Sequence, residues 1–169
     1  MNRNESATKH FRVINTEAYF QMVKHELCET GEATIRVTGD SMRPLLHHLR
    51  DQVVLVPPEK VRRGDIVLFD RRNGRYALHR VIHAGKRGFD MAGDNQWHME
   101  RDLPYEQIVG VVERICRNGR WVSSKNILMK IYSWGVTLLT VPRIYLRQAI
   151  RVLVKPFRRD KTLRQKGTL

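Results

Sequence analysis

The chain has 169 residues, a length that fits one domain with extensions, because about 120 residues can already bury a workable core. Its 31 Lys and Arg residues outnumber its 17 Asp and Glu residues, and the formal net charge of +14 favours a polyanionic neighbour such as a membrane surface or nucleic acid. The two cysteines, Cys28 and Cys116, are too few for a disulfide framework or a zinc site, and no histidine cluster has metal-ligand spacing. We therefore expect no metal and no cofactor.

The start of the chain predicts a polar segment followed by one helix. Residues 1–15 have mixed charge and no apolar run of signal-peptide length, so we expect neither a secretory signal nor an N-terminal membrane anchor. Residues 16–30 are expected to form a helix that Gly31 ends. The apolar residues that recur at helical spacing in it are Phe20, Val23 and Leu27. Through them the helix is expected to pack against the sheet.

The middle of the chain, residues 33–124, has the pattern of an antiparallel β domain. Short apolar segments alternate with turns rich in Gly, Pro and Asn, as in mainly β folds. The expected strands cover residues 33–38, 51–56, 66–69, 76–82, 89–92, 108–116 and 121–122. The first strand ends in residues 39–44, with the sequence GDSMRP, where Ser41 lies between a turn and Pro44 with its hydroxyl near solvent.

Four short motifs carry a resemblance to a known family. They are GDSMRP at residues 39–44, GDIVLF at 64–69, YALHRVI at 76–82 and GDN at 93–95. In this order and spacing they resemble the S24/S26 serine peptidase superfamily, which contains the signal peptidases and the self-cleaving proteins of the LexA and UmuD type. The resemblance covers about residues 33–115. It implies a mainly β, signal-peptidase/LexA-like domain that acts as a serine endopeptidase on a protein or peptide substrate.

The resemblance also implies a catalytic base. A serine hydroxyl becomes a nucleophile only when a base removes its proton, and superfamily members use Lys or, in the ER-type signal peptidases, His. The aligned residue here is His79. A neutral imidazole titrates near physiological pH without burial, whereas a lysine base must be desolvated. His47 and His48 lie too close to Ser41 in the sequence to be placed opposite it. We therefore expect a Ser41–His79 dyad.

Two carboxylates compete for the position that orients the histidine. Asp94, in GDN, occupies the place of the family's motif acid, and Asp102 resembles a second acid that ER-type members carry shortly downstream. The same resemblance also lets Asp94 pair with Arg80, so the choice between the two stays open. Backbone N–H groups at the serine turn, chiefly that of Ser41, are expected to form the oxyanion hole.

The sequence departs from both well-known branches of the superfamily. Signal peptidases usually carry an N-terminal transmembrane anchor, and here a basic C-terminal tail takes its place. LexA-type members cleave themselves at an Ala-Gly or Cys-Gly bond upstream of the serine. In this chain the Ala-Gly pairs, at residues 84–85 and 92–93, follow Ser41 and fall inside the predicted sheet. Residues 1–32 are also too few for a DNA-binding domain, so autocleavage is disfavoured.

The tail, residues 125–169, contains eleven Lys and Arg residues and one acid, Asp160. Two helical pieces are expected, divided by Pro142. A basic stripe at four-residue spacing is formed by Arg143, Arg147, Arg151 and Lys155. No uncharged run is long enough to span a bilayer, so we expect the tail to lie on an anionic membrane surface. The alternative is that its apolar side packs on the β domain and its basic side stays solvated.

Three functional interpretations follow, on a chain divided into residues 1–32, 33–124 and 125–169. The first is a signal-peptidase-like serine endopeptidase held at a membrane by its tail, cytoplasmic or peripheral. The second is a non-catalytic binding protein on the same fold. The third is a LexA-like regulator associated with nucleic acid, which is less favoured because no recognition motif is present. The oligomeric state and the substrate are left open.

Overall fold

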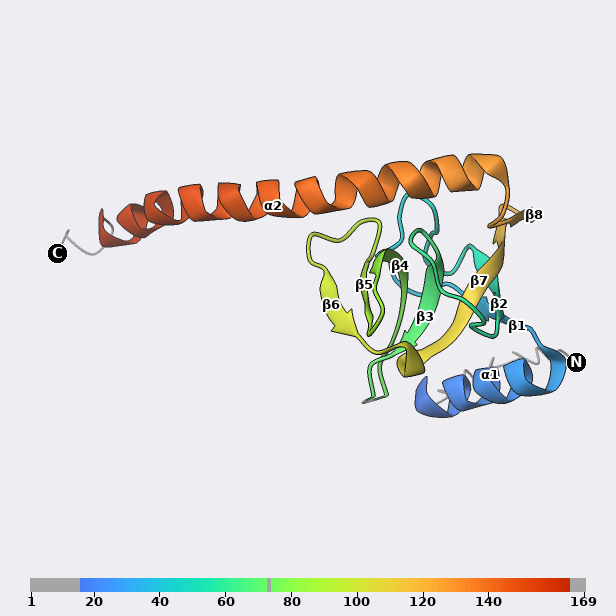
Figure 1. Cartoon of the computed structure of the whole chain (residues 1–169). Coiled ribbons are helices and arrows are strands. Elements are labelled where there is room, and N and C mark those ends of the chain that lie inside the picture. Colours follow the sequence, from blue (N-terminus) through green and yellow to red (C-terminus); the bar gives the residue numbers. More distant parts are fainter. Residues whose placement is uncertain (1–15, 73, 165–169) are drawn as a thin grey trace, which may run out of the picture.

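The protein folds into one antiparallel sheet with a helix at each end of the described chain (Figure 1). The structure, a computed structural model, describes residues 16–72 and 74–164, and in the last helix it describes side chains up to residue 150, except residue 148. The predicted polar segment 1–15 and the side chains of Arg151 and Lys155 in the basic stripe lie outside this part. The mainly β fold class with an N-terminal and a C-terminal helix is confirmed.

Eight strands are described, and seven of them follow the order β1-β2-β7-β3-β4-β5-β6, while β8 pairs with β7. The strands are β1 Ala33–Arg36, β2 Gln52–Val56, β3 Ile66–Asp70, β4 Tyr76–Ala84, β5 Phe89–Ala92, β6 Glu100–Leu103, β7 Ile108–Arg117 and β8 Arg120–Ser123. The helices are α1 Thr16–Thr30, the 3₁₀ turn η1 Tyr105–Gln107, and α2 Ile127–Arg164. The central strand β3 is a run of four buried apolar residues, because neighbours cover both of its faces.

The expected helix over residues 16–30 is confirmed as α1, and it packs as its spacing predicts. Val23 and Leu27 are buried in the core, and Phe20 stacks on Tyr76 of β4 with ring centroids 3.9 Å apart. The same core contains Met42 and Leu46, from the segment that follows β1. The serine turn is therefore anchored in the main core of the domain.

Strand β6 was not among the expected strands. Its sequence, ERDL, has no apolar alternation, and its burial pattern is mixed, as for a strand at the edge of a sheet. It forms because it pairs with β5, Phe89 opposite Leu103 and Met91 opposite Glu100. The local sequence pattern therefore did not predict β6, which depends on its pairing with β5 in the tertiary structure.

The division of the tail at Pro142 was wrong, because α2 is one helix of 38 residues that continues through this proline. A proline inside a helix leaves the carbonyl of the fourth residue before it without its donor. Here that residue is Leu138, which is half exposed, and Pro142 is exposed as well. Water can therefore satisfy the freed carbonyl, and the helix is not broken.

Helix α2 crosses the sheet and then runs on beyond it (Figure 1). Its inner face is mixed, because Ile144 is buried and Met129 and Tyr132 pack against the core. Thr137 and Thr140 are also buried there, and both hydroxyls donate to carbonyls of the preceding helical turn. Its outer face carries exposed apolar side chains. Most apolar side chains of residues 127–150 thus point away from the β domain, and the alternative that the apolar side packs on it holds only for a few residues, such as Met129 and Tyr132. Among the described residues, no helix is both long and apolar enough to cross a membrane.

Candidate active site

The serine turn is built by a loop that folds back onto β1. Val37 lies just beyond the strand. Its amide donates to the Asp51 carbonyl over 3.0 Å, and its carbonyl accepts from the Leu49 amide over 2.8 Å. A tight turn follows, in which the Arg43 amide donates to the Asp40 carbonyl over 3.3 Å. Met42 is buried, whereas Ser41 beside it is partly exposed. The core thus fixes the backbone of Ser41 and leaves its side chain accessible.

The segment after β5, residues 93–97, packs directly against Ser41. The Asn95 amide donates to the Ser41 carbonyl over 2.8 Å. Gly93 is so close that a Cβ there would lie 2.6 Å from the Ser41 carbonyl oxygen and 3.0 Å from the Ser41 Cβ. A glycine is therefore required for the approach of these two turns. We call residues 93–97 the clamp turn.

His79 lies on the same face of the sheet as Ser41. The register of β4 and β5 ends with Arg80 opposite Ala92, and its extension by one position would set His79 opposite Gly93. Opposed residues of an antiparallel pair project to the same face, and on this face the Cβ position of Gly93 meets Ser41. In the described part of the chain no hydrogen bond joins the Ser41 hydroxyl to His79. Such bonds are often long before substrate binds.

The carboxylate that contacts His79 is Glu100, the first residue of β6. The His79 side chain is 3 % exposed, and its Nδ1 lies 3.2 Å from Glu100 Oε1. Arg71 donates to both carboxylate oxygens, over 2.9 Å from Nε and 2.5 Å from a terminal nitrogen. Burial alone would raise the pKa of Glu100, but the hydrogen bonds from His79 and Arg71 outweigh it and lower that pKa to about 2.

An ionised Glu100 decides the tautomer of His79. A carboxylate can only accept hydrogen bonds, so Nδ1 must carry the proton that it donates to Glu100. In the neutral imidazole the lone pair is then on Nε2. This is the tautomer that a general base needs in order to take a proton from a serine.

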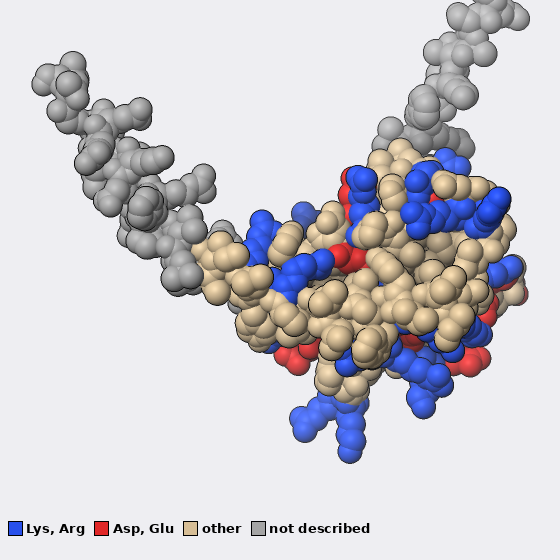
Figure 2. Space-filling model, turned by 90° about the horizontal axis from the view of Figure 1, so that it is seen from above, with Lys and Arg blue, Asp and Glu red and all other residues tan. Residues whose placement is uncertain are grey.

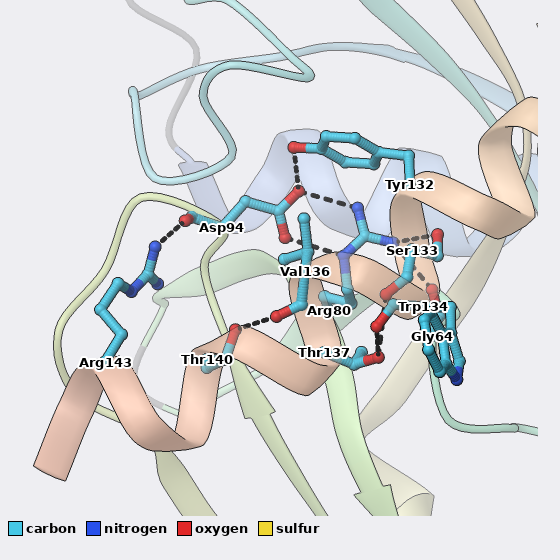
Figure 3. Close-up of polar contacts among 10 residues, drawn as sticks. All are labelled: Gly64, Arg80, Asp94, Tyr132, Ser133, Trp134, Val136, Thr137, Thr140 and Arg143. Atoms are coloured by element: carbon cyan, nitrogen blue, oxygen red, sulfur yellow. Dashed lines mark hydrogen bonds and ion pairs between the residues drawn. The ribbon is translucent and has the colours of Figure 1, made fainter.

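Neither aspartate that was expected to orient His79 contacts it. Asp94 is buried and pairs through both oxygens with Arg80, each over 2.8 Å (Figure 3). Asp102 is exposed, with a positive φ of 53°, and its amide donates to Asp90. Sequence reasoning missed Glu100, two residues before Asp102. Glu100 could have been placed near β4 only if β6 had been recognised as a strand that pairs with β5.

The two alternative histidines support the loop that carries the serine turn. His48 Nδ1 accepts a hydrogen bond of 2.8 Å from the Gly39 amide. His47 lies beside Arg50 and Asp51. The Ser41 amide, the expected oxyanion donor, makes no hydrogen bond to any other described residue, so it is free to donate to a substrate.

A mainly antiparallel β sheet with an N-terminal and a C-terminal helix is consistent with the fold of the S24/S26 serine peptidase superfamily. Within that superfamily, the sequence of residues 4–113 matches the Peptidase S24-like family. The match spans more than half of the chain, and the protein belongs to this family. A search of curated proteins found no match. Membership supports a peptidase or LexA-like function in general. It does not establish catalytic activity, because the family contains serine peptidases as well as non-catalytic members.

Proposed function

We propose that the protein is a serine endopeptidase of signal-peptidase-like type in which Ser41 is the nucleophile, His79 the general base and Glu100 the residue that orients the base. The observation that carries the proposal is the buried His79, held through Nδ1 by an ionised carboxylate on the sheet face where Ser41 packs. The expected roles of Ser41 and His79 are kept, and Glu100 takes the place first considered for Asp94 or Asp102.

In this mechanism His79 Nε2 takes the hydroxyl proton as the Ser41 oxygen attacks the peptide carbonyl, and the imidazolium then donates that proton to the leaving amine. Glu100 stabilises the imidazolium by its charge. The Ser41 amide donates to the oxyanion of the tetrahedral intermediate. Water then releases the acyl group from Ser41 with His79 again as the base.

The test is cleavage of a defined mixture of synthetic peptides, read by mass spectrometry, together with labelling by a fluorophosphonate that reacts with activated serines. The wild-type chain should cleave a subset of peptides and gain the label on Ser41. Ser41→Ala should do neither, and His79→Ala should lose nearly as much, because members of such a unit are not additive. A wild type that neither cleaves nor labels would support the non-catalytic binding protein, whereas a Ser41→Ala variant that still cleaves would show that the chemistry lies at another residue.

His79→Lys distinguishes the two branches of the superfamily. Lysine is the base in the other branch, but it works only when its environment lowers its pKa. Here a new ammonium would lie beside Glu100, which favours the charged form. We therefore expect His79→Lys to be inactive in the peptide assay, and activity near the wild-type level would contradict the role given to Glu100.

We further propose that α2 holds the peptidase on an anionic membrane surface. The supporting observation is the outer face of the helix, where apolar side chains are 50–72 % exposed. They are Ile127, Leu128, Ile131, Trp134, Leu138, Leu139, Tyr145, Leu146 and Ile150. Seen from the α2 side, a band of uncharged surface is bordered by Lys and Arg (Figure 2). Trp and Tyr among aliphatic residues are typical of a helix at the headgroup boundary.

The charge of the neighbouring surface favours anionic lipid over a second copy of this cationic chain. A groove of about 1070 Å³ beside the N-terminal half of α2 is lined by basic residues and reaches Trp134. The basic residues are Lys60, Arg62, Arg63, Lys125 and Lys130, alongside Arg80. The acids in its lining are Glu59, Asp65 and Glu113. Glu113 pairs with Lys125, and Asp65 accepts from the Arg62 amide. Each basic residue near the surface adds about 1 kcal/mol of attraction.

The basic stripe should contribute less to membrane binding than the sequence indicated. Arg143 is partly buried and Arg147 is exposed, and both lie over the ring of Trp97, with 5.3 and 4.6 Å from guanidinium carbon to ring centroid. Membrane binding should therefore depend mainly on the apolar face of α2. It should also be less sensitive to salt than binding through a fully solvated basic stripe.

The experiment is vesicle flotation of the full chain, because α2 also contacts Asp94 and a truncation would disturb the β domain. The wild type should float with phosphatidylglycerol-containing vesicles and much less with phosphatidylcholine alone. The double variant Leu138→Ser/Leu139→Ser should lose flotation, while Arg147→Met should keep it. A DNA gel shift and light scattering at the same salt complete the test. Retention on DNA without flotation, or dimers that the double variant abolishes without any flotation of the wild type, would overturn the membrane proposal.

A further inference from the structure

Arg143, on the inner face of α2, contacts the backbone of the clamp turn. Arg143 donates to two backbone carbonyls of that turn, Asp94 O over 2.8 Å and Gln96 O over 2.6 Å. Figure 3 shows the first of these contacts, with Arg143 reaching from α2 to Asp94. Two charge-assisted bonds from one planar group fix the relative position of the two carbonyls. Trp97, at the end of the turn, lies under the same guanidinium.

A second set of contacts joins α2 to the side chain of Asp94. Tyr132 donates its hydroxyl to Asp94 Oδ2 over 3.2 Å, and Arg80 donates to both oxygens. Arg80 also donates to the Ser133 hydroxyl over 2.5 Å and to the Gly64 carbonyl over 2.9 Å (Figure 3). Burial, together with the charge of Asp94, raises the pKa of Tyr132, so its hydroxyl stays a donor. The carboxylate and the carbonyls of the clamp turn are thus both held from α2.

The opposite side of the clamp turn holds the nucleophile. Asn95 donates its amide to the Ser41 carbonyl over 2.8 Å and its side-chain amide to the Asp40 carbonyl over 3.3 Å. Gly93 leaves no space for a side chain between the two segments. A shift of the clamp turn must therefore move the backbone of Ser41.

We infer that Arg143 is a positioning residue for Ser41, acting through the clamp turn, so that α2 is part of the scaffold of the active site. The inference rests on the proposed function. His79 and Glu100 lie on the other face of β4 from Arg80 and α2, so Arg143 acts on the nucleophile and not on the base. Loss of its two hydrogen bonds lets the turn relax, and a displacement of about 1 Å at a reacting atom can cost about 10²-fold in rate.

The chain offers a matched control for the test. Arg147 lies one helical turn further on and covers the same Trp97 ring, but it makes no hydrogen bond to the clamp turn in the described structure. Arg143→Met should lower kcat in the peptide assay by about 10-fold or more, with KM and the acid limb of the pH profile little changed, because the base is untouched. Arg147→Met should stay within about 2-fold of the wild type, as for most surface substitutions. Arg143→Lys keeps the charge and one donor nitrogen, so its kcat should lie between those of Arg143→Met and the wild type.

Hydrogen exchange gives a readout that does not depend on activity. In Arg143→Met the amides of residues 39–43 and 93–97 should exchange faster, while those of β3 and β7 should not change. If Arg143→Met fails to fold, Tyr132→Phe removes only one hydrogen bond to Asp94, and it should still increase exchange in the same two segments. Unchanged exchange and kcat in folded Arg143→Met, or equal losses in both methionine variants, would overturn the inference. Absence of cleavage by the wild type overturns the proposed function instead, whereas the exchange result still tests the coupling.

Discussion

The substitution Glu100→Gln removes the charge beside His79 while keeping the size of the side chain. The gap of 3.2 Å between His79 Nδ1 and Glu100 Oε1 corresponds to about 5 kcal/mol of attraction for the imidazolium at an effective dielectric constant of about 20. The Glu100 side chain is 22 % exposed, and solvent screening reduces this attraction to about half. The remaining 2–3 kcal/mol, acting on the transition state, predicts a fall in kcat of about 10²-fold.

The assay is cleavage of the best peptide of the synthetic mixture, with kcat and KM measured separately. Asp102→Asn is the matched control, because it removes the acid that the sequence resemblance favoured and that has no contact with His79 in the structure. KM should change little in either variant, since Glu100 acts on the base, Asp102 makes no hydrogen bond to it in the described structure, and neither residue is placed in substrate binding. A large loss in Asp102→Asn with near-normal activity in Glu100→Gln would refute the assignment of Glu100.

Two further predictions concern the same site. Titration of Glu100 should not affect kcat above about pH 2, since its lowered pKa keeps the carboxylate ionised, and a fall in kcat at higher pH that Glu100→Gln abolishes would contradict this. Gly93→Ala should cost about 1–3 kcal/mol of stability and most of the activity, as thermal unfolding and the peptide assay would show, because its Cβ meets the Ser41 carbonyl. A Gly93→Ala variant with wild-type activity would mean that the clamp turn does not position Ser41.

The sequence alone determined the parts of this protein that depend on local pattern. Alternating apolar residues with turn residues between them predicted most of the strands, and the helical spacing of Phe20, Val23 and Leu27 predicted α1 and its packed face. The serine turn and the strand of His79 were found for the same reason, because each is a short motif read along the chain. Edge strand β6 escaped this reasoning, since ERDL has no pattern of its own.

Only the tertiary structure decided which side chains meet. Glu100 lies near His79 because the sheet places β4, β5 and β6 side by side in this order. No local sequence pattern contains this arrangement. The spacing of α2 predicts two faces but not which of them faces the sheet. The sheet presents the buried pair of Arg80 and Asp94 at that point, and buried charges need hydrogen-bonding partners. Tyr132 and Ser133 supply these partners, so the face of α2 that carries them packs inward and most of the helix's apolar side chains are left exposed.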